Sequence, residues 1–412
     1  MSVLSCSRSV GLLFILILSL QWSFASPPKA SGRQVIGYFT EGGAKSGHYT
    51  VKNMVTSGAA KLLTEVNYAF GRVINDRCEI GDREAALNHA YSAADSVDGT
   101  ADPAGENQLR GTFHQLEELK RLYPHLKLVI SFGGWGQSDG FSSAVQPEHL
   151  KEFVRSCVET FIEGHFAPGL EGPQIFDGID IDWEYPVEGG VTAGRPEDMA
   201  NFTAMAVEFR RQLDAVRPGL LLTAALPAPA ELFKNFELKK VVDSMDFLSI
   251  MAYDLHWDSE PMTFLHSPLF HDPADPSKPP FDIRNGDFAV HGFLAAGVPA
   301  NKIVLGVPFY GKGWTGVPDV KGGLYQSATG PAKVDGSYRA LKELAGVTYR
   351  KYYKKAATCS VWNNTNFWSY DCPEAMRKKM SYIRRQRLGG VMFWELSHDT
   401  ADSELLHVLG SR

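Results

Sequence analysis

Eight short apolar runs recur along the chain, and most of them are separated by a segment whose apolar residues have helical spacing. The runs are rich in β-branched and aromatic residues and span 35–39, 65–70, 127–132, 176–183, 220–225, 247–252, 303–307 and 390–394. The clearest helical segments span 109–122, 147–164 and 198–216. Strands that are apolar throughout and alternate with helices are typical of a parallel sheet covered by helices.

Eight such units over about 250 residues or more favour a closed barrel over an open sheet. An open sheet usually carries a glycine-rich phosphate loop after its first strand, and the segment Gly37-Tyr-Phe-Thr-Glu-Gly-Gly43 lacks the GxGxxG spacing. We therefore predict an α/β fold, a (β/α)8 TIM barrel over residues 33–412. The interval between the seventh and eighth runs is too long for one crossover, so we expect a small α+β insertion at about 314–384.

The first 26 residues differ in composition from the rest. Arg8 precedes the apolar run 10–20, and Ser23-Phe24-Ala25 follows it, which is the pattern of a secretory signal. A membrane span needs roughly 20 apolar residues, and Gln21 interrupts this run. We expect a signal peptide over 1–25 and a protein that is secreted, either extracellular or periplasmic.

The charge and the cysteine content of the chain limit the classes of partner and cofactor that we expect. The net charge is −6 and no long basic run occurs, so nucleic acid and, after signal removal, membrane are not expected as partners. No CxxC motif or His/Cys cluster has zinc spacing, and we expect neither metal nor cofactor. Cys359 and Cys372 flank an aromatic-rich stretch and can staple a hairpin, a pairing that the sequence leaves open. Cys157 lies on an apolar helical stripe and is interpreted as a small core residue.

Three acids occur at alternate positions in the segment Phe176-Asp-Gly-Ile-Asp-Ile-Asp-Trp-Glu-Tyr-Pro186. They are Asp180, Asp182 and Glu184, and together they form the acid file. Side chains alternate along a strand, so Asp180, Asp182 and Glu184 point the same way, toward the barrel mouth. Repulsion and burial must raise at least one of their pKa values, which keeps a carboxylic acid protonated near neutrality. We predict Glu184, the outermost, as general acid, with Asp182 next to it and Asp180 as the buried proton partner.

Two other interpretations of the acids are a calcium site and a solvated acidic strand. Calcium sites prefer flexible loops with Asn, Gly and carbonyl ligands. A solvated strand would not place Ile179, Ile181 and Trp183 between the acids. Catalysis is therefore the favoured interpretation.

The acid segment resembles the DGxDxDxE signature of glycoside hydrolase family 18, the chitinases, with every fixed position filled. Further resemblances follow in order: Ser131-Phe-Gly-Gly-Trp135 to the SxGG strand, Met251-Ala-Tyr-Asp254 to the MxYD strand, and 307–314 and 390–395 to the last two strands. The resemblance spans 34–409. It implies a barrel with an α+β insertion before the last strand, and a chitin or chitooligosaccharide substrate.

The family mechanism that the resemblance implies is substrate-assisted, because the 2-acetamido oxygen of the sugar attacks the anomeric carbon. Glu184 then protonates the leaving oxygen and later activates water, while Asp182 stabilises the oxazolinium-like intermediate. Tyr253 is implied to bond the acetamido oxygen, Asp254 to support the distorted sugar, and Trp394 to floor the pocket.

The remaining expected substrate-binding residues lie at predicted strand ends, where aromatic side chains suit the apolar faces of pyranose rings. They are Tyr38, Phe70, Ser131, Gly133, Gly134, Trp135, Tyr185, Met251, Ala252 and Trp257. Ser131 and Tyr38 are also expected to support the Asp180–Asp182 end of the acids. The predicted protein is a monomeric secreted chitinase that cleaves β-1,4-linked N-acetylglucosamine with retention.

The sequence departs from the family pattern at two positions. Lys312 stands where many relatives carry Arg, so a bidentate contact is lost, and His398 follows the last strand where a small residue is common. His256, His266 and His398 are expected to be ordinary polar loop residues.

Two alternatives remain. One is a chitin-binding lectin without catalysis, a class that usually lacks the terminal acid present here as Glu184. The other is a family enzyme acting on N-glycans or bacterial wall glycan, a class that generally lacks the large insertion. Endo against exo action stays open, as does glycosylation at Asn201 and Asn363.

Overall fold

A computed structural model of the chain describes residues 33–45, 49–105, 108–170 and 172–411. The expected signal peptide over 1–25 lies outside these residues. Within the described ranges, none of the helices combines the length and the apolar character that crossing a membrane requires.

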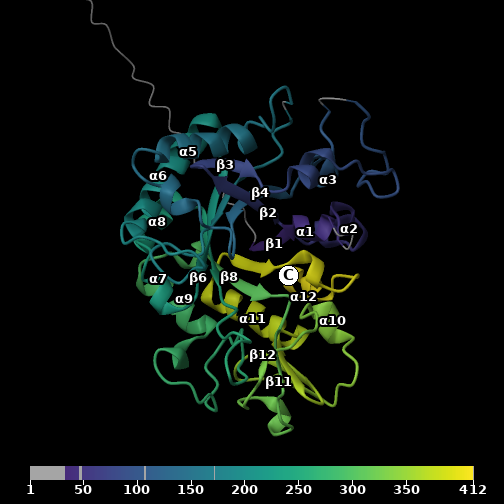
Figure 1. The fold of residues 1–412 in the computed structure, drawn as a ribbon, viewed down its shortest axis with the longest axis vertical. Helices are drawn as coiled ribbons and strands as arrows, with labels where there is room; N and C mark the ends of the chain where they lie inside the picture. Colours follow the sequence, from purple (N-terminus) through teal and green to yellow (C-terminus); the bar gives the residue numbers. More distant parts are fainter. Residues whose placement is uncertain (1–32, 46–48, 106–107, 171, 412) are drawn as a thin grey trace, which may run out of the picture. The chain divides into compact units, whose positions relative to one another are not determined.

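Eight parallel strands form a closed barrel (Figure 1). In spatial order they are β1 (Gln34–Thr40), β14 (Gly390–Trp394), β8 (Ile303–Pro308), β7 (Phe247–Met251), β6 (Leu221–Pro227), β5 (Gly178–Asp182), β4 (Lys127–Gly133) and β2 (Glu65–Ile74). Pairing of β1 with β2 closes the ring, and β3 (Arg77–Ile80) adds an antiparallel hairpin to β2. The predicted fold class and all eight expected strands are confirmed.

Helices lie between the strands in sequence. They are α1 (Glu41–Lys45), α2 (Val51–Thr56), α3 (Gly111–Leu122), α4 (Phe141–Ala144), α5 (Leu150–Cys157), α6 (Asp198–Val216), α7 (Ala230–Phe233), α8 (Leu238–Ser244), α9 (Gly286–Ala295), α10 (Tyr338–Lys342), α11 (Pro373–Gln386) and α12 (Glu404–Gly410). Figure 1 shows α5, α6 and α8 side by side, in agreement with their contacts. The apolar face of α6, from Phe202 to Leu213, is buried at helical spacing, which is why the sequence located this helix well.

A second, antiparallel sheet lies between β8 and β14 in sequence. Its order is β10 (Gly330–Pro331), β9 (Lys312–Thr315), β13 (Asn366–Tyr370), β12 (Thr358–Asn363) and β11 (Tyr349–Tyr353). It has its own apolar cluster, which includes Trp314, Trp362 and Phe367. The sheet ends at Tyr370, so the expected boundary near residue 384 falls inside α11, a helix that contacts β14 and α12.

Two disulfides join the four cysteines of the described part. Cys359–Cys372 links β12 to the residues after β13, the pairing that the sequence left open. Cys78–Cys157 ties β3 to α5. Cys157 is a core residue, as interpreted from the sequence, but it is also disulfide-bonded, which the sequence did not predict. It lies on the buried face of α5, but a partner 79 residues away leaves no trace in local periodicity.

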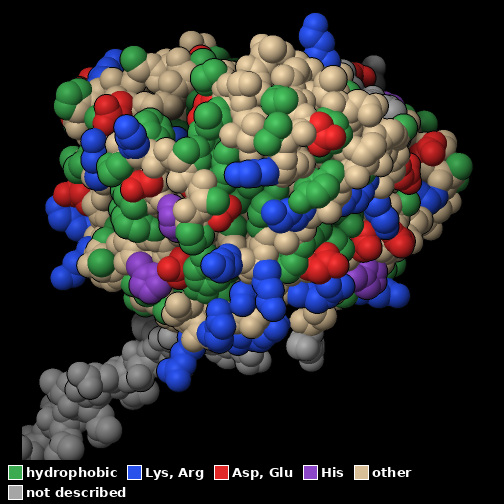
Figure 2. Space-filling view, turned by 90° about the horizontal axis from the view of Figure 1, so that it is seen from below, with side chains coloured by type: hydrophobic (Ala, Val, Ile, Leu, Met, Phe, Trp, Pro, Cys, Tyr) green, Lys and Arg blue, Asp and Glu red, His purple; other side chains and the backbone are tan. Residues whose placement is uncertain are grey.

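The surface view in Figure 2 shows Lys and Arg side chains interspersed with Asp and Glu, with basic side chains gathered toward one edge of that face. Charges of both signs on one face agree with the modest net charge of the chain.

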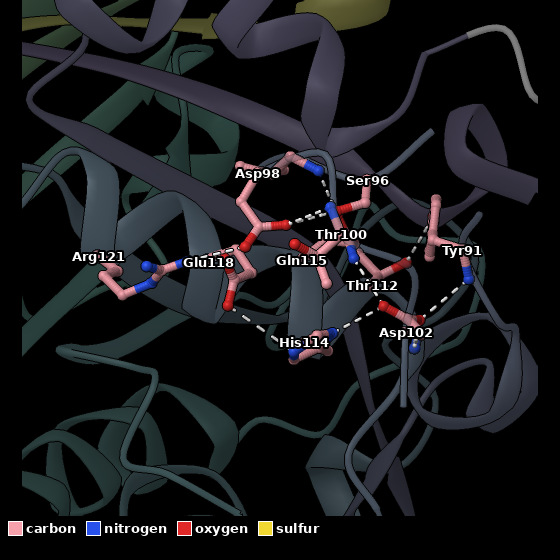
Figure 3. Close-up of polar contacts among 12 residues, drawn as sticks. Tyr91, Ser96, Asp98, Thr100, Asp102, Thr112, His114, Gln115, Glu118 and Arg121 are labelled. Atoms are coloured by element: carbon pink, nitrogen blue, oxygen red, sulfur yellow. Dashed lines mark hydrogen bonds and ion pairs between the residues drawn. The ribbon is translucent and has the colours of Figure 1, made fainter. Parts of the chain in front are cut away.

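The long connection from β3 to α3 is held by one buried carboxylate, Asp102 (Figure 3). Its oxygens accept hydrogen bonds from Tyr91 N at 3.0 Å and Gly111 N at 3.1 Å. They also contact His114 Nδ1 at 2.7 Å and accept from Gln115 Nε2 at 2.8 Å. Because the side chain of Asp102 is fully buried, this carboxylate fixes the connection to the first turn of α3.

Asp102→Ala is therefore expected to lower the free energy of unfolding by about 2–3 kcal/mol, since several buried donors lose their acceptor. Asp95→Ala, at an exposed position in the same connection, is the control and should change stability little. Denaturant titration of both variants checks this. Equal, small effects in the two variants would contradict the assignment of Asp102 as the organising group.

Candidate active site

The acid file predicted from the sequence lies on and just beyond β5, at the end of the barrel where the parallel strands finish. Asp180 and Asp182 alternate with Ile179 and Ile181, which are buried in the main core. The acids therefore face the barrel interior, as the alternation predicts. Glu184 follows two residues after the strand and lines an open cavity.

Asp180 accepts hydrogen bonds from three hydroxyl groups on three strands. Tyr38 Oη and Ser131 Oγ each lie 2.8 Å from Oδ2, and Thr223 Oγ1 lies 2.6 Å from Oδ1. Burial raises the pKa of Asp180, and these three hydrogen bonds oppose the rise. The structure thus places Tyr38 and Ser131 beneath the cavity, on Asp180. Thr223 was not singled out by the sequence, although it is the one polar residue of an otherwise apolar strand.

Asp182 and Glu184 form a coupled pair above Asp180. Burial, followed by the charges of Glu184 and Asp180, raises the pKa of Asp182 well above its usual range. Its Oδ1 has no hydrogen-bond partner within the described residues. Burial raises the pKa of Glu184 to about 7, with a further contribution from the charge of Asp254, while a hydrogen bond with Tyr185 opposes the rise. Glu184 can therefore both give and take a proton near neutral pH.

Asp254 follows β7 in a left-handed backbone conformation, with φ of 53°. His266 Nδ1 lies 3.4 Å from its Oδ1, and Lys312 Nζ lies 3.4 Å from its Oδ2. Burial acts to raise the pKa of Asp254, but the His266 hydrogen bond and the charge of Lys312 outweigh it and lower the pKa. Asp254 is therefore a fixed anion. Lys312 also lies 4.2 Å from the centre of the Trp257 ring.

The histidines are expected from the sequence to be polar loop residues rather than ligands, and His256 and His266 do lie in the connection after β7. The sequence did not indicate that His266 is completely buried and contacts Asp254. His256 is buried as well, stacked on Phe264 with ring centres 4.1 Å apart. Both lie in the segment after β7, and no periodic pattern in the sequence of that segment indicates that it packs back over the site. His398 remains partly exposed, with Nε2 3.2 Å from Glu395 Oε1.

The cavity above the acids has a volume of about 310 Å³. Many of the expected site residues line it: Phe70, Trp135, Asp182, Glu184, Tyr185, Met251, Tyr253, Asp254, Trp257 and Trp394. Two aromatic pairs stand out in its wall. Phe70 stacks on Trp394 with ring centres 5.6 Å apart, and Trp135 lies 5.1 Å from Trp257. Trp135 is 47% exposed, which suits a platform for a ligand.

Several expected contact residues lie outside the cavity lining: Tyr38, Ser131, Gly133, Gly134 and Ala252, together with the acid Asp180. The two glycines serve close packing instead. Both have positive φ, and a Cβ on Gly133 would lie 2.2 Å from the Asp182 carbonyl oxygen, while one on Gly134 would lie 2.6 Å from the Phe70 ring.

Tyr310, an aromatic residue at a predicted strand end and a candidate platform from the sequence, also lines the cavity, whereas the sequence did not indicate six further lining residues: Gln137, Gly189, Ala228, Pro229, Leu232 and Arg284. Arg284 is the most constrained. Its Nε donates to Glu231 Oε1 at 3.0 Å, its Nη1 donates to Leu255 O at 3.2 Å, and its guanidinium lies 4.1 Å from the Phe281 ring centre. These residues lie in the connections that follow β4 to β8, where no repeat or alternation marks which side chain turns inward.

The described residues contain no group of three or more His, Cys, Asp or Glu side chains that could hold a metal ion. The side chains around the cavity offer a carboxyl group, Glu184, that can exchange a proton near neutral pH, a fixed anion, Asp254, and aromatic rings for stacking.

Comparison with known proteins gives a consistent result. The chain matches the model described as Glycosyl hydrolases family 18 over residues 34–399. Chitinase C of Streptomyces lividans is 36% identical over 390 residues, which cover 92% of this chain and 59% of that protein. The chain thus spans about three fifths of the length of the curated relatives it matches.

Two solved structures resemble this one closely. The catalytic domain of psychrophilic chitinase B from Arthrobacter TAD20 superimposes with a TM-score of 0.85 at 34% identity, covering 92% of this chain and 94% of that one. A family 18 N-acetylglucosaminidase from Paenibacillus barengoltzii gives a TM-score of 0.72 at 29% identity, covering 92% and 99%.

The electrostatic coupling in the site predicts the effect of removing one charge. Asp254→Asn should lower the pKa of Glu184 from about 7, because the charge of Asp254 contributes to raising it. Titration of the Glu184 carboxyl by infrared difference spectroscopy against Glu184→Gln measures this pKa. Asp258→Asn, a change outside the cavity lining, is the control. An unchanged or higher Glu184 pKa in Asp254→Asn would refute the coupling.

Proposed function

The chain belongs to glycosyl hydrolase family 18, and on that premise we propose that it is a chitinase that hydrolyses β-1,4-linked N-acetylglucosamine chains. The observation that carries the proposal is the acid file. Asp180, Asp182 and Glu184 lie in one row, and the outermost acid, with a pKa of about 7, opens into a cavity walled by aromatic rings. The chitinases of the comparison support chitin as the substrate.

Glu184 supplies the proton in the proposed reaction. The acetamido oxygen of the bound sugar forms a bond to the anomeric carbon, the glycosidic C–O bond breaks, and the Glu184 proton passes to the leaving oxygen. Glu184, now a carboxylate, then takes a proton from the water that opens the oxazolinium intermediate. A group with a pKa near neutrality suits both steps.

Asp182 stabilises the positive charge of that intermediate. In the proposed complex, its Oδ1 accepts the acetamido N–H, which agrees with a buried oxygen that has no partner within the described residues. Tyr253, in the cavity wall, donates to the acetamido oxygen and orients it for attack. Asp254, held as an anion by His266 and Lys312, supports the distorted ring of the sugar.

Aromatic rings bind the sugar chain on both sides of the acids. Phe70 and Trp394 form one stacked pair, and Trp135 and Trp257 form the other. Trp394 stacks beneath the sugar that is cleaved, and the remaining rings bind the neighbouring sugars of the chain. Pyranose rings present apolar C–H faces to such platforms.

The insertion extends the groove in this proposal. A second hollow of about 220 Å³ shares Tyr310 with the cavity and is also lined by Lys312 on β9, Trp368 on β13 and Val334, which follows β10. A longer sugar chain can therefore continue along the second sheet. We also propose that residues 1–25 direct secretion. A monomeric state stays a prediction.

Glu184→Gln tests the proposal most simply. The amide keeps the shape of the side chain but cannot donate the acid proton, so turnover of chitotetraose should fall roughly 10²–10⁴-fold while binding persists. Glu188→Gln, at an exposed position nearby that pairs with Lys234, is the matched control and should stay active. Product analysis gives turnover, and calorimetry gives binding.

Near-parental cleavage by a folded Glu184→Gln would rule out Glu184 as the proton donor. Binding of chitotetraose without cleavage by the parent protein would favour the lectin alternative. The products of the active protein also separate endo from exo action.

A further inference from the structure

A second buried acid, Glu65, lies inside the barrel below the catalytic file. Along β2, Val66 and Tyr68 belong to the main core between barrel and helices. Ala69 belongs to the small inner cluster with Ile36, Tyr38 and Met392. Because side chains alternate along a strand, Glu65 and Asn67 face the interior with Ala69. Glu65 and Asn67 are 1% and 2% exposed.

Three oxygens of these two inner side chains have no partner among the protein groups of the described part. Both carboxyl oxygens of Glu65 and the Oδ1 of Asn67 are buried without a hydrogen-bond partner there. An ionised carboxyl in such a place is far costlier than a neutral one. Burial, then the charges of Asp180, Asp246 and Asp177, hold the pKa of Glu65 well above its usual range, and Lys127 opposes this only in part.

Tyr38 connects these inner side chains to the catalytic acids. Tyr38 Oη donates its single proton to Asp180 Oδ2 at 2.8 Å. The side chain of Asn67 acts to lower the pKa of Tyr38, which fits an amide N–H that faces the phenol oxygen. The Oδ1 of Asn67 then needs a donor. Glu65 lies two residues away on the same face, about 6.6 Å along the strand.

We propose that Glu65 is a positioning residue whose neutral carboxyl donates a hydrogen bond to Asn67 Oδ1, directly or through one water. The chain Glu65, Asn67, Tyr38, Asp180 then has a donor and an acceptor at every step. It orients the Tyr38 hydroxyl toward Asp180 and keeps Asp180 ionised beside Asp182. The effect on turnover rests on the proposed function, whereas the neutral state of Glu65 does not.

The experiment compares Glu65→Gln, whose amide can still donate, with Glu65→Met, which cannot. Glu65→Met should lower kcat on chitotetraose about tenfold with KM unchanged, the size expected for weakening a hydrogen bond to a charged group. The acidic limb of its kcat–pH profile should move to higher pH, because an Asp180 carboxylate with weaker hydrogen bonds is protonated more easily. Glu65→Gln should keep the parental profile.

Infrared difference spectra test the protonation state independently. At neutral pH the parent should show a carboxylic-acid carbonyl band that Glu65→Gln lacks and that the exposed control Glu148→Gln retains. Absence of that band, a parental kcat and pH profile in folded Glu65→Met, or an equal loss in both Glu65 variants would overturn the proposal. If Glu65→Met does not fold, the infrared comparison of Glu65→Gln with the parent tests the proposal on its own. If the parent cleaves no chitooligosaccharide, the proposed function fails, but the infrared result still tests Glu65.

Discussion

Three hydroxyl groups converge on the Asp180 carboxylate at the centre of the barrel, and the site above depends on that contact. The hydroxyls come from Tyr38 on β1, Ser131 on β4 and Thr223 on β6. Only a closed barrel brings these strands around one point, since β1 reaches β4 through β2 on the closing side. Closure of the fold and ionisation of Asp180 are thus linked, because a buried carboxylate needs donors to remain charged.

The charge of Asp180 affects the pKa of the acid directly above it, Asp182. Its field and that of Glu184 help to keep the pKa of Asp182 high, and Glu184 itself has a pKa of about 7. On the other wall, Lys312 and His266 hold Asp254 as an anion. The site therefore combines one carboxyl group, Glu184, that can exchange a proton near neutral pH with another, Asp254, that stays charged. That division is what a single residue acting first as acid and then as base requires.

The sequence predicted the barrel because its strands are apolar runs and its longer helices have clear amphipathic spacing. It predicted the acid file because alternation on a strand determines which way Asp180, Asp182 and Glu184 face. It did not predict the Cys78–Cys157 bond, the burial of His266 or the place of Arg284 in the cavity wall. These depend on contacts between distant segments and on the paths of connections, for which a sequence has no local period.

In the proposed reaction the substrate's own acetamido group, rather than a protein carboxylate or a directly attacking water, displaces the leaving group while Glu184 donates the proton. Time-resolved proton NMR of chitooligosaccharide cleavage tests it most directly, because two successive displacements at the anomeric carbon preserve configuration. The proposed mechanism predicts that the β-anomer is released first and then mutarotates, and that a glucosamine unit at the cleaved position, lacking the acetyl group, is not cut. Initial release of the α-anomer, or cleavage at a glucosamine unit at a comparable rate, would contradict it.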